Sequence, residues 1–163
     1  MSRPYFKHVY QGKKMSLEIL SKTKIDLLGD AAQFSIFAIR VWSSATYQKI
    51  PIEKALGGVF EDFCGLKVLD TFDECMSLMA VAALREVSIA CCPSNEYVVG
   101  DEAAVLNCFR ELECHNTHSA IDKMDGIILS ALKPTFCTTA EPFVEQLNNS
   151  GLFFGSPNTL SLV

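Results

Sequence analysis

The sequence contains no long apolar run and no export signal. None of its segments approaches the roughly 18–20 consecutive apolar residues that a membrane-spanning helix requires. Lys7, Lys13 and Lys14 interrupt the N-terminal segment, and no cleavage site of small residues follows them, so the sequence shows no secretory signal peptide. We therefore expect a cytoplasmic protein that does not enter a membrane.

The common catalytic motifs are also missing. The sequence has no G-x-x-x-x-G-K-[ST] or G-x-G-x-x-G loop for phosphates, no G-x-S-x-G nucleophile turn and no H-E-x-x-H zinc motif. It has only 3 histidines, which leaves few groups for general acid–base catalysis near neutral pH. These absences favour a non-catalytic protein that needs no cofactor.

Charge is unevenly distributed along the chain. The net charge is −5, but residues 1–24 hold six basic residues and one acid, whereas the remainder holds eight basic residues and 18 acids. An acidic body repels the phosphates of nucleic acids, so we expect no nucleic-acid partner. We divide the chain into a basic, partly disordered arm over 1–24, a helical domain over 25–151 and a C-terminal tail over 152–163.

Apolar residues recur mainly at helical spacing, and this periodicity predicts an all-α fold. Pro51, Asp101 and the Thr138-x-x-Glu141 capping box are typical of helix beginnings, and Pro134 is expected to end a helix. Short loops favour antiparallel neighbours, so we expect an irregular bundle of about six helices. The expected helices span 25–48, 51–63, 67–87, 101–114, 117–132 and 138–149.

Two segments depart from a uniform helical pattern. The helix over 25–48 is apolar on most of its circumference, which predicts a central position with Trp42 buried. Residues 89–99 combine two short β-prone runs with the turn composition Pro93-Ser94-Asn95-Glu96, which predicts either a small two-stranded hairpin or an extended loop packed on the helices.

The cysteines are best interpreted as reduced thiols that help to fill the core. Their number, 7, is odd and their spacing is irregular, which argues against a disulfide framework. On apolar helix faces a thiol behaves as a small hydrophobic group.

One group of cysteines and histidines carries an alternative hypothesis. Cys114 and His118 are four residues apart with His115 between them, and Cys91 or Cys92, or Cys108, could complete a zinc site. Adjacent cysteines can also form a labile disulfide, so a redox sensor is a related hypothesis. The competing interpretation is an exposed polar loop, because Asn116-Thr117 resembles a helix N-cap that would separate the ligands.

Two apolar residues fall within polar stripes of the longest predicted helices. Phe37 lies in the stripe that contains Asp30 and Arg40, and Val81 occupies the same relative position on the helix over 67–87. They predict either an interface with a partner protein or a homodimer, or two positions that the arm or Leu152-Phe153-Phe154 covers. The sequence thus predicts a small helical adaptor or regulator, with a thiol- or zinc-dependent sensor as the alternative.

Overall fold

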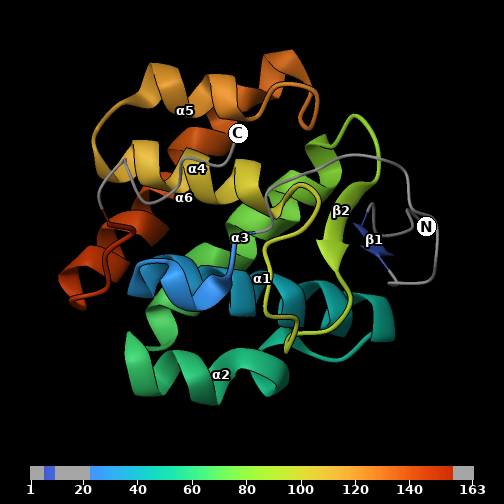
Figure 1. Ribbon diagram of the computed structural model, residues 1–163, viewed down its shortest axis with the longest axis vertical. Coiled ribbons are helices and arrows are strands. Elements are labelled where there is room, and N and C mark those ends of the chain that lie inside the picture. The colour runs from blue at the N-terminus through green and yellow to red at the C-terminus, as the bar shows by residue number, and fades with distance from the viewer. Residues whose placement is uncertain (1–5, 10–22, 156–163) are drawn as a thin grey trace.

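A computed structural model describes residues 6–9 and 23–155, which form mainly helices (Figure 1). The predicted irregular all-α bundle is confirmed, with six α-helices in the described ranges. The arm expected over 1–24 and the tail expected over 152–163 lie mostly outside these ranges. The helices are α1 (Asp30–Gln48), α2 (Ile52–Phe63), α3 (Leu66–Ala82), α4 (Glu102–Glu113), α5 (Thr117–Lys123) and α6 (Lys133–Asn149). Two short 3-10 helices, η1 (Ile25–Leu27) and η2 (Ser130–Leu132), and two strands, β1 (Phe6–Val9) and β2 (Val87–Ala90), complete the fold.

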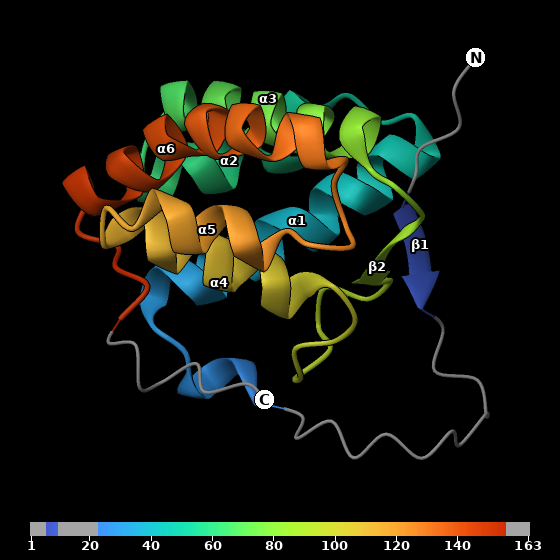
Figure 2. The ribbon, with the colours of Figure 1, turned by 90° about the horizontal axis from the view of Figure 1, so that it is seen from above.

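The helices pack pairwise around α1, α3 and α6. Figure 1 shows α4 between α5 and α1, with α2 on the other side of α1, and Figure 2 shows α6 alongside α3. Within the described ranges, none of the helices is long and apolar enough to cross a membrane.

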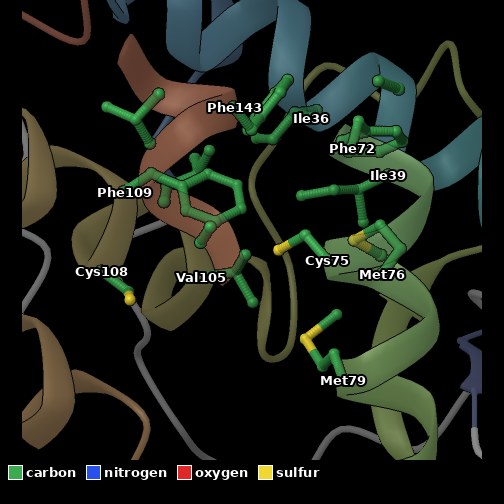
Figure 3. Packing of buried hydrophobic residues seen from close by; sticks show 14 of the residues in the cluster. Ile36, Ile39, Phe72, Cys75, Met76, Met79, Val105, Cys108, Phe109 and Phe143 are labelled. Carbon is green, nitrogen blue, oxygen red and sulfur yellow. The ribbon is translucent and has the colours of Figure 1, made fainter. Parts of the chain in front are cut away.

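The core lies between α1, α3, α4 and α6, as Figure 3 shows. Aromatic rings, methionines and cysteines fill much of it. Trp42 is 3% exposed, which confirms the central position of its helix. The labelled core residues are Ile36, Ile39, Phe72, Cys75, Met76, Met79, Val105, Cys108, Phe109 and Phe143, and all are at most 1% exposed.

Phenylalanine rings form a connected series through this core. Neighbouring ring centroids are 4.9–6.0 Å apart, a spacing at which aromatic pairs attract each other beyond simple area burial. The series therefore links α2 at one side of the bundle to the chain that follows α6. In order it contains Phe34, Phe60, Phe72, Phe143, Phe109 and Phe154.

The first long helix begins five residues later than predicted. Residues 25–27 form η1, and α1 starts at Asp30 after Gly29. The chain after α6 crosses at this point, because Ala31 donates its backbone N–H to the carbonyl of Phe153 at 3.1 Å. A Cβ on Gly29 would lie 2.6–2.8 Å from the backbone of Phe153 and Phe154, so only glycine allows this close approach.

Of the two alternatives for residues 89–99, the hairpin is wrong, because the two runs do not pair with each other. Its first run contributes β2, which pairs in parallel with Phe6–Val9 rather than with the second run. In the second run, Tyr97 forms an antiparallel bridge with Lys24. Both partners come from the N-terminal part of the chain, which local turn composition cannot indicate.

Two other predicted helix ends shift because of long-range backbone hydrogen bonds. The third helix ends at Ala82 instead of residue 87, since Leu84 donates to Ile127 and Leu129 donates to Ala82. The same two hydrogen bonds hold residues 127 and 129 outside a helix. The fifth helix therefore ends at Lys123 and not at residue 132.

Two predicted helix beginnings also need correction. Helix α6 starts at Lys133 with Pro134 in its first turn, so Pro134 begins this helix instead of ending the previous one. Thr138 is therefore internal and donates its hydroxyl to the Pro134 carbonyl, so it forms no capping box. Asp101 precedes α4 without a capping hydrogen bond, because its carboxylate binds Arg85 and the Ser88 amide.

Candidate functional site

An apolar groove lies between α1 and α2. These helices are antiparallel neighbours joined by the short segment 49–51, so the first half of α1 faces the second half of α2. The groove has a volume of about 620 Å³. It is lined by Asp30, Gln33, Phe34, Phe37, Val59, Phe63 and Leu152.

Aromatic side chains dominate the open side of this groove. Phe63 is 59% exposed and Phe37 is 36% exposed, while Phe34 lies below them at 8%. The Phe34 and Phe63 rings are 5.8 Å apart, so both walls contribute to one continuous aromatic surface. Grouped exposed aromatic residues mark binding surfaces more often than single exposed apolar residues do.

The two predicted interaction residues occupy different places. Phe37 lines the groove, whereas Val81 is 76% exposed on α3 and is not among the lining residues. Leu152 forms part of the groove wall but leaves Phe37 partly exposed, and Phe154 is buried beside Phe109. Sequence reasoning missed the α2 wall, although Val59 and Phe63 are four residues apart and therefore share one helix face.

A second structured feature surrounds Arg40, which the helical pattern placed on a polar stripe but which is fully buried. Its Nε and Nη2 atoms donate to the two carboxylate oxygens of Glu102, each at 2.8 Å. Its guanidinium also donates to the carbonyls of Asn95 at 2.6 Å and Tyr97 at 2.7 Å. A planar fork of donors suits this combination of carboxylate and carbonyl acceptors.

Glu102 holds the other side of the same loop. Its carboxylate accepts hydrogen bonds from the backbone amides of Ala90 at 3.0 Å and Val99 at 2.9 Å. Arg40 and Glu102 together therefore fix residues 90–99 against α1, and they supply the hydrogen bonds that a hairpin would otherwise make.

The candidate thiols Cys91 and Cys92 lie on this fixed loop. Cys91 is half-buried and Cys92 is exposed, with its Sγ atom 2.9 Å from the Ser94 hydroxyl oxygen. Hydrogen bonds to the hydroxyl and backbone of Ser94 lower the pKa of the Cys92 thiol, and the positive charge of Arg40 acts in the same direction. Cys92 thus combines exposure with a lowered pKa, the combination that favours thiolate chemistry.

The other candidate ligands lie at the junction of α4 and α5. Cys114, His115 and His118 are all exposed there, and α5 begins only at Thr117, so no continuous helix joins Cys114 to His118. Across the described ranges, no group of three or more His, Cys, Asp or Glu side chains is arranged to hold a metal ion. The structure does not bring this junction and the Cys91-Cys92 pair together as one zinc site.

The remaining cysteines are in or near the core. All seven cysteines lie in the described part of the chain, and all are free thiols. Burial raises the pKa of the Cys64 thiol to about 11 and raises that of Cys75 still further, so both favour the unreactive protonated form. The Sγ atoms of Cys108 and Cys137 are 4.0 Å apart in the core.

No protein-family model matches this sequence, and comparisons with curated proteins and with solved structures find no significant match.

Proposed function

We propose that this protein is a non-catalytic helical adaptor that binds another protein through the groove between α1 and α2. The observation that carries the proposal is the pair of exposed aromatic rings, Phe37 and Phe63, over an apolar groove of about 620 Å³. Buried aromatic anchors supply most of the energy in many protein interfaces. Phe37 was predicted as an interaction residue from helical phase alone, and its place in the groove supports that hypothesis.

The double substitution Phe37→Ser with Phe63→Ser tests this proposal. Both side chains are partly exposed, so we expect the variant to stay folded and to lose about 1 kcal/mol or less of stability per site. If the two anchors together contribute about 2 kcal/mol or more of binding free energy, their removal should weaken the affinity for the partner about thirtyfold or more. Quantitative mass spectrometry of retained proteins, with circular dichroism to verify folding, measures both effects.

Val81→Ser is the matched control for this experiment, because Val81 is exposed but lies outside the groove lining. We expect it to retain the same partners as the unmodified protein. Light scattering of each variant shows whether the retained partner is a second copy of the chain. Equal losses for Val81→Ser and the double variant would contradict the groove proposal and would favour a wider surface that includes both helices.

A thiol sensor is the second candidate function, and the exposure and lowered pKa of Cys92 favour it. Cys92 is expected to react with iodoacetamide at a lower pH than an ordinary thiol, because only the thiolate attacks. Ser94→Ala should shift its reaction profile to higher pH, since the variant lacks the hydroxyl that stabilises the thiolate. Mass spectrometry of the alkylated peptides measures the profile, with buried Cys75 as the unreactive reference.

Identical pH profiles for Cys92 with and without the Ser94 hydroxyl would contradict this second candidate. They would show that the Ser94 hydroxyl, the largest cause of the lowered pKa of Cys92, does not stabilise its thiolate.

A further inference from the structure

We infer that the partner of the groove is a basic amphipathic helix. This inference rests on the proposed function, because it specifies the chemistry of the protein segment that the groove accepts. It is carried by three observations on the described residues: the groove walls are helices, the lining is aromatic, and the one charged residue in the lining is an acid.

The walls favour a helix over an extended segment. Backbone groups of α1 and α2 already form helical hydrogen bonds, so the groove offers no strand edge to which a peptide could add. A helix satisfies its own backbone groups and needs only side-chain contacts from the walls. The lining from Asp30 to Phe37 extends along α1 for two turns, or about 10 Å, which matches partner side chains at positions i, i+3 or i+4, and i+7.

The charges around the groove favour a basic helix. Asp30 is the single charged residue in the lining, and Asp62 is exposed beside Phe63 on the turn of α2 that forms the other wall. Residues 30–37 and 57–63, which form the facing halves of the two walls, contain no Lys or Arg. Neither of these two carboxylates forms an ion pair within the described part of the chain. Lys and Arg on the partner would complement them and accelerate association.

The same charges argue against other occupants. A symmetric dimer through this groove would bring two copies of Asp30 and Asp62 together, and like charges across an interface are unfavourable. An anionic membrane surface or a nucleic acid would be repelled for the same reason. A separate protein segment with apolar and basic faces avoids both problems.

The test uses three designed 18-residue peptides as probes. The first carries Leu at helical spacing with Lys elsewhere, the second replaces every Lys with Glu, and the third has the composition of the first in an order without helical periodicity. We expect the Leu/Lys peptide to bind at least about tenfold more tightly than either of the others, as measured by calorimetry at low salt. Chemical-shift changes in α1 and α2 should accompany binding.

Protein variants locate the bound peptide. Phe37→Ser with Phe63→Ser should abolish binding of the Leu/Lys peptide, and Asp30→Asn with Asp62→Asn should weaken it about three- to fivefold and reduce its salt dependence. Asp122→Asn is the matched control, because Asp122 is an exposed acid on α5, away from the groove. We expect this control to bind as the unmodified protein does.

The possible failures of the two proposals are distinguishable. Equal binding of the Leu/Glu peptide would overturn the charge inference while leaving an apolar groove that binds proteins. Equal binding of the non-periodic peptide, or no binding of any peptide, would overturn the helical partner. Binding of the Leu/Lys peptide that survives Phe37→Ser with Phe63→Ser would place the interaction elsewhere and would overturn the proposed function itself.

Discussion

Arg40→Ala is expected to destabilise the protein by about 3–5 kcal/mol, the usual cost of removing one partner from a buried ion pair. The substitution would leave the fully buried Glu102 carboxylate without its partner. It would also remove the hydrogen bonds that Arg40 donates to the partly buried carbonyls of Asn95 and Tyr97, which adds to the cost. Chemical denaturation followed by circular dichroism measures the change in the free energy of unfolding.

Arg85→Ala is the matched control for this result. Arg85 forms a similar two-point ion pair with Asp101, but its side chain is 51% exposed. An exposed ion pair contributes about 1 kcal/mol or less, so the control should remain close to the unmodified protein. If Arg40→Ala lowered the free energy of unfolding no more than Arg85→Ala does, the result would contradict the burial of Arg40 beneath the loop.

A double variant separates the ion pair from the loop contacts. Arg40→Met with Glu102→Leu removes both charges, so it should cost less than the sum of the two single substitutions by about 1–3 kcal/mol. Full recovery is not expected, because the amides of Ala90 and Val99 would still lose the carboxylate that they bind. Additive effects would contradict a direct interaction between Arg40 and Glu102.

Arg40 also shows where sequence periodicity reaches its limit. The pattern over 25–48 predicts the helix and its apolar faces, and Trp42, Ala38 and Ile39 are buried as it indicates. Periodicity identifies which residues share a face, but it does not reveal what covers that face. The loop over 93–97 covers Arg40, and this contact joins segments more than 50 residues apart.

The helix boundaries failed for a related physical reason. Pro134 is compatible with the end of one helix and with the first turn of the next, so the residue alone does not decide between them. The decision comes from the bridge between Ala83 and Ile128, which interrupts the predicted helix over 117–132. Strand β2 likewise finds its partner among residues 6–9, far away in sequence.

The sequence predicted one wall of the candidate groove but not the other. Phe37 stands out because it is apolar within a polar stripe, and this signal is local to one helix. The opposite wall requires knowledge that α2 packs beside α1, and the contribution of Leu152 requires the path of the chain after α6. Local pattern therefore identified one anchor, while tertiary packing supplied the shape of the site.

Trp42→Ala is expected to cost about 3–5 kcal/mol, as large aromatic deletions in protein cores do. Trp42 is 3% exposed in the middle of α1, and its indole Nε1 donates to the Asp73 carboxylate of α3 at 2.6 Å. The substitution would therefore create a cavity and also remove a charge-assisted hydrogen bond between two helices. For a chain of this length, the melting temperature should fall by about 6–20 °C.

Two further variants divide this effect into its parts. Trp42→Phe keeps most of the ring volume but lacks the donor to Asp73, so its loss of about 1.5–3 kcal/mol should exceed that of a neutral hydrogen bond. Phe37→Ala removes an aromatic ring from the same helix at a position that is 36% exposed, and it should cost about 1 kcal/mol or less. A melting temperature that falls by only a degree or two for Trp42→Ala would show that Trp42 is not buried. It would also mean that α1 is rotated about its own axis relative to the position described above. Phe34 and Phe37 would then face elsewhere, and the groove would lose its structural basis.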